Sequence, residues 1–171
     1  MMETGSTRLD HYYKRFERNS LKIEKELTFS IDEMIVPYKG TRAGSRKQYV
    51  QNKPKKWGFK MFVRAGVSGI VYDFFVYEGE DTFWFTSFTE EEKSMGLGAK
   101  VAIPLAKSIC QPDCKILCFD NFFTSIELTH PLRNECVIFS LGTAKFNRLR
   151  GAQEEPPTNI HLKKKGRGSH A

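Results

Sequence analysis

The sequence predicts an α/β fold in which three antiparallel strands and two helix-and-strand crossovers form a mixed sheet. Short runs of aromatic and β-branched residues dominate the first half of the chain, as is typical of strands. In the second half, apolar stripes at helical spacing alternate with short apolar runs. The 171 residues, 40% of them hydrophobic, suffice for one domain with a core. The predicted order βββαβαβ packs helices against a mixed sheet.

The first strand is predicted at residues 27–36, after a helical lead-in at residues 1–26. The helical spacing of the lead-in is set by four apolar or aromatic side chains, which are Leu9, Tyr12, Tyr13 and Phe16. Within the strand, successive side chains alternate between two faces. One face carries Phe29, Ile31 and Ile35, and the other carries Ser30, Asp32, Met34 and Val36. Pro37 and Gly40 end the strand.

A long loop and a hairpin are predicted next. Residues 41–56 are polar, basic and interrupted by Pro54, so we expect them to be exposed to solvent or to a ligand. Residues 57–65 and 70–77 are rich in aromatic and β-branched side chains, and the glycines at 66 and 69 supply the turn between them. Three antiparallel strands therefore follow one another along the chain.

The first crossover combines a helix at residues 97–109 with a short buried strand at residues 116–119. Val101, Leu105 and Ile109 form the apolar stripe of the helix. The strand is followed at once by Asp120, which places a carboxylate at the carboxyl end of a strand. This is the edge of an α/β sheet at which ligands usually bind.

The second crossover combines a helix that begins near residue 124 with a last strand at residues 137–141. Thr124 and Glu127 have the spacing of a capping box. Pro104 and Pro131 fall inside the two predicted helices, where an interior proline costs about 3 kcal/mol, so we expect damaged or shortened helices. The core then covers residues 27–150, and residues 151–171 form a basic tail that we expect to be disordered.

Charge is segregated along the chain, which carries a net charge of +7. Residues 39–64 hold nine basic side chains and no acidic one, whereas residues 78–92 hold six acidic side chains and no basic one. A second basic tract runs from Lys145 to Arg167. This distribution favours a polyanionic partner. The sequence shows neither a signal peptide nor an apolar run of about 20 residues, so we expect an intracellular protein without a membrane partner.

Four cysteines would stay reduced in an intracellular protein. They are Cys110, Cys114, Cys118 and Cys136. The first three recur at every fourth position, but the paired spacing of structural zinc sites is missing, and Cys118 lies in a strand pattern. We therefore expect no zinc and ordinary buried thiols.

Asp32 and Asp120 are the candidate metal ligands. A carboxylate in the middle of an apolar strand is costly unless it is solvated, paired or bound to a cation. Two carboxylates on neighbouring strands suit Mg²⁺ or Mn²⁺, and a pair of such ions supports phosphoryl transfer. Position alone favours Asp32 as an edge-facing polar residue and Asp120 as a turn or cap residue. Spacing and composition leave both interpretations open.

Several segments resemble the piggyBac transposases and the cellular proteins derived from them. Residues 30–40 (SIDEMIVPYKG) resemble the first-aspartate motif of that family, and residues 118–125 (CFDNFFTS) resemble the second-aspartate motif. Between and after them, similarity continues through Lys47 to Tyr49, Asn52 to Pro54, Lys56 to Lys60, Gly69 to Tyr77, Gly142 with Thr143, Asn147 with Arg148, and Lys164 to Ser169. The resemblance is collinear and covers roughly residues 29–169.

The resemblance implies an RNase H-like core in which three aspartates bind two divalent metals to cut and rejoin DNA through terminal hairpins at TTAA targets. By this matching, Asp32 and Asp120 are the first two ligands and the catalytic pair. The third aspartate of the family comes downstream of the Lys-Gly-Arg-Gly segment and has no counterpart here, and neither does the cysteine-rich, zinc-binding module. We therefore expect a core that is incomplete at its C-terminus, with at most one weakly held Mg²⁺.

The expected function is that of a transposase-derived, DNA-binding protein located in the nucleus whose catalytic core is inactive. The predicted backbone contacts are all basic: Lys39, Arg42, Arg46, Lys47, Lys53, Lys55, Lys56, Lys60 and Arg148. One alternative is a degenerate fragment or a protein-interaction module, which would bind a partner protein or a second copy through an uncovered face of the sheet. A further alternative is metal-dependent transposase activity with the third carboxylate supplied by a partner chain.

Overall fold

The computed structural model describes Phe16, residues 18–20, 22–41, Ala43, residues 46–51, 53–111, 113–148 and Lys164. Phe16 is helical, but the rest of the predicted apolar stripe of the lead-in lies outside the described residues, and so do Arg42 and the tail except Lys164. The strands are β1 (Thr28–Pro37), β2 (Lys47–Tyr49), β3 (Trp57–Gly66), β4 (Val71–Val76), β5 (Ile116–Phe119) and β6 (Phe139–Gly142). The helices are η2 (Gly79–Phe83), α2 (Glu90–Ser94), α3 (Leu97–Lys107), α4 (Ile126–Asn134) and η3 (Phe146–Arg148).

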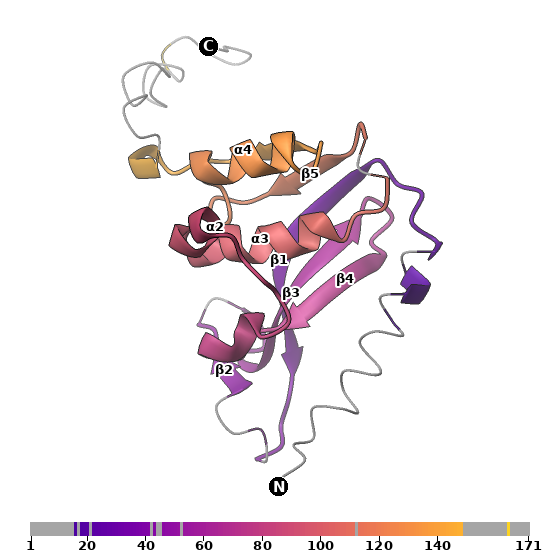
Figure 1. The fold of residues 1–171 in the computed structure, drawn as a ribbon. Helices are drawn as coiled ribbons and strands as arrows, with labels where there is room; N and C mark the ends of the chain where they lie inside the picture. The colour runs from indigo at the N-terminus through magenta and orange to yellow at the C-terminus, as the bar shows by residue number, and fades with distance from the viewer. Residues whose placement is uncertain are drawn as a thin grey trace, which may run out of the picture.

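The strands form one mixed sheet, which confirms the predicted fold class. Its order is β2-β3-β1-β5-β6, and β4 pairs with β3 beyond the residues that pair with β2. β1 and β4 are antiparallel to β3, whereas β5 is parallel to both β1 and β6. The antiparallel meander is thus followed by α/β crossovers, as the sequence predicts. Helices α2, α3 and α4 lie together on one side of the strands (Figure 1).

The hydrophobic core lies between the sheet and the helices. Phe29 and Ile31 of β1 are buried, as the alternation predicts, while Ser30, Asp32, Met34 and Val36 are exposed on the opposite face. α3 supplies three fully buried aliphatic side chains, which are Val101, Ile103 and Leu105. Each such side chain stabilises the fold by about 1.5–3 kcal/mol relative to an exposed one. The packing of α3 therefore contributes strongly to the stability of the core.

The two prolines do not break their helices, so the expectation of damage is wrong. α3 continues through Pro104 to Lys107, and α4 continues through Pro131 to Asn134. The carbonyl of Pro104 accepts a bond from the amide of Ser108, and that of Pro131 accepts one from the amide of Glu135. Each ring removes only one amide donor, and the buried side chains of each helix hold it against the core.

Three further local predictions need correction. The segment at residues 41–56 is not a continuous loop, because β2 pairs with the start of β3. α4 is capped by Ser125, whose hydroxyl accepts from the amide of Leu128, whereas the Thr124 hydroxyl donates to the Asp120 carbonyl. Residues 78–92, for which the sequence predicts no helix, include η2 and the start of α2, which begins with a capping box formed by Thr89 and Glu92. Short elements of this kind lack the repeated apolar spacing on which sequence patterns depend.

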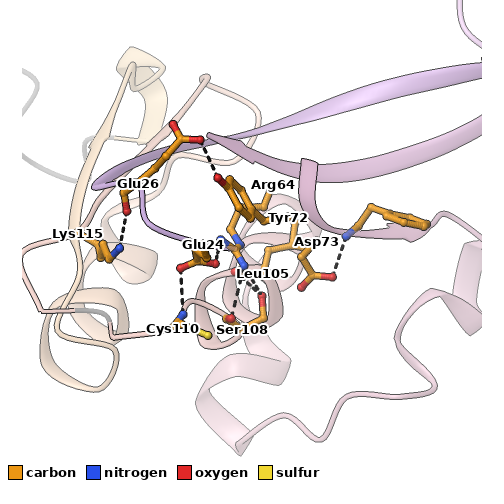
Figure 2. A network of polar contacts seen from close by, with 10 residues as sticks. Glu24, Glu26, Arg64, Tyr72, Asp73, Leu105, Ser108, Cys110 and Lys115 are labelled. Atoms are coloured by element: carbon orange, nitrogen blue, oxygen red, sulfur yellow. Dashed lines mark hydrogen bonds and ion pairs between the residues drawn. The ribbon is translucent and has the colours of Figure 1, made fainter. Parts of the chain in front are cut away.

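A buried ion pair ties the segment before β1 to β3 and to the end of α3 (Figure 2). The Arg64 guanidinium lies 2.8 Å from the Glu24 carboxylate, and both side chains are 0% exposed. Glu24 also accepts a bond from the amide of Cys110, and Arg64 donates to the hydroxyl of Ser108. The guanidinium stacks 4.9 Å from the ring centre of Phe29. Burial this complete makes each charge depend on the other, because either charge alone would be uncompensated.

Glu26 forms a second connection beside this pair (Figure 2). Its carboxylate accepts bonds from the hydroxyls of Ser68 and Tyr72, and its carbonyl accepts one from the ammonium of Lys115. The hydrogen bond from Ser68 is the main reason why the pKa of Glu26 is lowered. Burial, followed by the bond to Glu26, raises the pKa of Tyr72. The strand that carries Asp32 is therefore fixed at its amino end by several partners.

Candidate functional site

Asp32 and Asp120 occupy corresponding positions on neighbouring parallel strands. The register pairs Ile31 of β1 with Phe119 of β5, and each aspartate is the next residue along its strand. Ile31 and Phe119 are buried on the helix side, whereas both aspartates are exposed. Adjacent strands lie about 4.8 Å apart. The fold therefore brings the two predicted carboxylates onto neighbouring strands, although 88 positions separate Asp32 from Asp120 in the sequence.

Backbone donors hold both carboxylates in position. Oδ1 of Asp32 accepts a bond of 2.7 Å from the amide of Glu33. Oδ1 of Asp120 accepts one of 2.8 Å from the amide of Phe122, and the Asp120 carbonyl accepts bonds from the amide and the hydroxyl of Thr124. The turn after β5 is thereby wound around Asp120. Asp120 is therefore a turn residue, and it remains exposed at the end of β5.

Arg148 anchors this turn. Its Nη1 donates to the carbonyls of Asn121, Phe122 and Thr124 over 2.8, 3.1 and 2.9 Å. The guanidinium is half-buried, so Arg148, which the sequence predicts as a DNA contact, is already engaged within the chain. Its first effect is to position the loop that carries Asp120.

The beginning of α3 packs against the same turn. A Cβ atom added at Gly98 would lie 2.2 Å from the carbonyl oxygen of Phe122. Real Cβ atoms do not approach backbone this closely, so only glycine fits here. Sequence reasoning misses this contact, and the only signal for it is a glycine within a helical pattern.

The predicted basic contacts separate into engaged and available side chains. The ammonium of Lys60 lies 2.8 Å from the Glu33 carboxylate, and Lys53 donates to the Glu33 carbonyl. The guanidinium of Arg46 lies 2.9 Å from the carboxylate of Glu78. These three charges are partly balanced within the protein, which the unbroken basic run in the sequence conceals.

Four further lysines lie around one hollow, which we call the lysine groove, and one of them, Lys47, also donates to the carbonyl of Gly40. The groove has a volume of about 500 Å³ and is lined by Pro37, Tyr38, Lys39, Lys47, Lys55, Lys56 and Trp57. Lys39, Lys55 and Lys56 are exposed, and Lys47 is half-buried with its ammonium 5.6 Å from the ring centre of Trp57. Among the residues that the structure describes, no acidic side chain lines this hollow. The arrangement presents concentrated positive charge beside an aromatic ring.

A larger hollow of about 800 Å³ lies between the start of α3 and α4. Glu91, Glu127 and His130 line it together with Arg148 and the turn after Asp120. Its mixed charges distinguish it from the lysine groove. Glu92 borders it as well, and its carboxylate lies 2.7 Å from the ammonium of Lys107.

Among the described residues, no group of three or more His, Cys, Asp or Glu side chains is placed to hold a metal ion. The four cysteines are free thiols. Only Cys136 is buried, whereas Cys114 is exposed, so the expectation of four buried thiols is wrong. Burial raises the pKa of Cys136. No helix in the described part of the chain is long and apolar enough to span a bilayer.

Comparisons with known proteins identify the relatives of this chain. A family model described as transposase IS4, of the DDE type, matches residues 8–170. The human piggyBac transposable element-derived protein 3 is 30% identical over 155 residues, which cover 90% of this chain and 24% of that protein. The chain thus spans about a quarter of the length of this curated relative.

The fold is also found in a solved structure. The cryo-EM structure of a piggyBac transposase synaptic complex with hairpin DNA is similar to this chain with a TM-score of 0.69 and 23% identity. The match covers 84% of this chain and 28% of that one. The chain accordingly has the RNase H-like fold of this transposase.

Proposed function

Because the chain belongs to the piggyBac-type transposase IS4 family, we propose that it is a DNA-binding domain whose lysines contact the phosphate backbone. The lysine groove is the observation that supports this proposal, since its described lining gathers four ammonium groups and no carboxylate around one hollow. Ammonium groups contact phosphates without reading base sequence. The structural relative was solved in complex with hairpin DNA, which is consistent with the same class of ligand.

The proposal assigns different roles to the predicted basic residues. Lys39, Lys47, Lys55 and Lys56 contact phosphates directly. Lys53 and Lys60 together neutralise Glu33, which leaves one positive charge on the three side chains. That charge adds to the attraction of DNA. Arg148 acts through the turn that it holds. Arg42 lies outside the described residues, and its predicted contact stays a prediction.

We also propose that Asp32 and Asp120 together hold one divalent cation. Transposases of the DDE type generally use divalent metal ions. The donor set fits, because Mg²⁺ is often bound by one or two carboxylates while it keeps several waters. Two aspartates carry two negative charges, which balance one such ion. When bound, the ion would supply positive charge to a nearby phosphate, and the expected role is binding of DNA rather than cleavage.

The test is a salt titration of binding to a labelled DNA duplex. Each phosphate contact contributes about −0.9 to the slope of log K against log salt. Replacing Lys39, Lys55 and Lys56 by Gln should therefore flatten the slope by about 2 to 3. The matched control replaces Lys22, Lys25 and Lys93 by Gln, which removes the same charge from exposed sites outside the groove. Equal losses in both variants would show that net charge, and not the groove, attracts DNA.

The metal arm repeats the titration with and without Mg²⁺. A gain in affinity with Mg²⁺ that disappears in Asp32→Asn/Asp120→Asn supports the shared cation. Strand cleavage by this chain in Mg²⁺ or Mn²⁺ would contradict the assignment of a binding role and support the transposase alternative. Nuclear localisation accompanies the proposal and is checked by imaging a fluorescent fusion in cells.

A second candidate function is self-association through the face of the sheet opposite the helices. Apolar side chains stay exposed there on β1, β5 and β6, namely Met34, Val36, Ile116, Phe139 and Leu141. Several exposed apolar side chains on one face of a sheet are a feature of interaction sites when they form a continuous patch. Light scattering tests it, because a dimer that Leu141→Lys converts to a monomer would support this candidate. A wild-type monomer at high concentration would exclude it.

A further inference from the structure

Two aromatic side chains stand exposed at the edge of the lysine groove. Trp57 is 54% exposed and Tyr49 is 50% exposed. They face each other across β2 and β3, with ring centres 5.0 Å apart and planes tilted by 56°. Neither is a core residue, although sequence patterns alone leave that interpretation open. Large aromatic rings held open to solvent beside basic side chains suggest a ligand with flat faces and negative charge.

The pair lies on the same face of the sheet as Asp32. The register pairs Asp32 with Val63, and Trp57 precedes Val63 by an even number of residues on β3. Alternation therefore points the side chains of Asp32, Val63 and Trp57 to one face. At about 3.3 Å per residue, Trp57 lies about 20 Å along the strand from the position beside Asp32. A nucleic-acid strand that follows this face passes both features.

We propose that Tyr49 and Trp57 form a stacking platform for unpaired bases of single-stranded DNA. This inference rests on the DNA binding proposed above and adds the form of DNA that the groove takes. Aromatic side chains stack on any base, because every base has a π face, and nearby cations hold the phosphates. Lys47 contributes both features, since its ammonium lies over the Trp57 ring and lines the groove.

The size and charge of the groove match this ligand. A volume of about 500 Å³ lies within the range of small-molecule sites, so the hollow can take a base with its sugar. A duplex offers no free base face at its sides, because its bases are stacked on one another. The rings at Tyr49 and Trp57 should therefore favour single strands, while the lysines contact both forms of DNA.

The first measurement is tryptophan fluorescence. The chain contains two tryptophans, Trp57 and Trp84, so Trp84→Phe leaves Trp57 as the only emitter. Addition of a twelve-base oligothymidine, about the site size of a single-strand-binding fold, should quench Trp57 emission as bases stack on its ring. In the matched variant Trp57→Phe, the remaining Trp84 emission should not change. Binding of the oligonucleotide without quenching of Trp57 would overturn the proposal.

The second measurement compares affinities for single-stranded and duplex DNA. Stacking of one base is worth a factor of about 5 to 150 in affinity by alanine substitution. Trp57→Ala and Tyr49→Ala should each weaken single-strand binding within this range and change duplex binding less than about twofold. Trp84→Ala is the control, because Trp84 is 63% exposed outside the groove. Thermal unfolding of each variant, with Trp57→Phe as the conservative substitution, separates loss of stacking from loss of folding.

The outcomes distinguish this inference from the DNA binding on which it rests. Salt-sensitive duplex binding with no effect of Trp57→Ala on single strands would overturn the platform and leave DNA binding intact. Absence of binding to either form would overturn both proposals. Tighter binding of an oligouridine RNA than of the DNA oligonucleotide would overturn the choice of DNA as the ligand.

Discussion

The buried pair of Glu24 and Arg64 gives the sharpest prediction about stability. Substitution of Arg64 by Met removes the guanidinium but keeps an unbranched side chain against the ring of Phe29. The Glu24 carboxylate, 0% exposed, would lose this cation and keep the hydrogen bond from the amide of Cys110. Removal of one partner from a buried ion pair costs about 3–5 kcal/mol. This is a large share of the roughly 5–15 kcal/mol by which domains are stable.

The double variant Arg64→Met/Glu24→Gln tests the physical reason. It removes both charges, and the Gln carbonyl can still accept from the amide of Cys110. Replacement of a buried ion pair by uncharged groups is often close to neutral. In the native pair, Nε of Arg64 has no hydrogen-bond partner among the described residues, so the charged arrangement is itself imperfectly satisfied there. The double variant should therefore be more stable than Arg64→Met alone by about 2 kcal/mol.

Urea denaturation followed by circular dichroism measures both effects. With a slope of about 2 kcal/mol/M, a loss of 4 kcal/mol lowers the midpoint by about 2 M. An Arg64→Met variant that loses less than about 1 kcal/mol would refute the assignment of a buried, mutually compensating pair. Additive losses in the double variant would refute it as well, because residues in one ion pair must couple.

Three further predictions follow from single positions. Gly98→Ala should displace the turn at Phe122, because the new Cβ would lie 2.2 Å from the Phe122 carbonyl oxygen. The salt titration should then show no gain in DNA affinity on addition of Mg²⁺, and an unchanged gain in affinity would contradict the close packing. Val137 has a φ of 57°, so Val137→Asn should raise stability by about 1 kcal/mol in urea denaturation, and a loss would contradict the strain. Burial raises the pKa of Glu92, but the hydrogen bonds from Lys107 and Thr89 lower it more, and the net shift is downward. The carboxylate therefore stabilises the fold above its ordinary pKa of 4.5, and this contribution is lost as the pH falls through the lower value in the folded state. Glu92→Gln should accordingly destabilise the chain in urea at pH 7 and destabilise it less at about pH 3. An equal loss at both pH values would contradict the ion pair with Lys107.

The sequence predicts most of the regular structure because strands and long helices have local patterns. Alternation along residues 28–36 identifies which side of β1 is buried, and the helical stripe ending near Ile109 identifies α3. The prolines lead to a wrong prediction of damaged helices. The sequence shows the hydrogen bond that Pro104 removes, but it does not show the buried contacts that hold α3 in place. β2 is missed because three residues are too few to alternate recognisably.

Some features of the candidate site can be predicted from the sequence, and others depend on the tertiary structure. The residue types of Asp32 and Asp120, each at a strand of recognisable pattern, follow from the sequence. Tertiary structure alone decides which basic side chains are available, because the partner of Lys60 is Glu33 on a neighbouring strand and the partner of Arg46 is Glu78. It also decides that Trp57 is exposed, since exposure depends on what the rest of the chain covers. Local patterns record the properties of neighbours in sequence, whereas ion pairing and burial depend on neighbours in space.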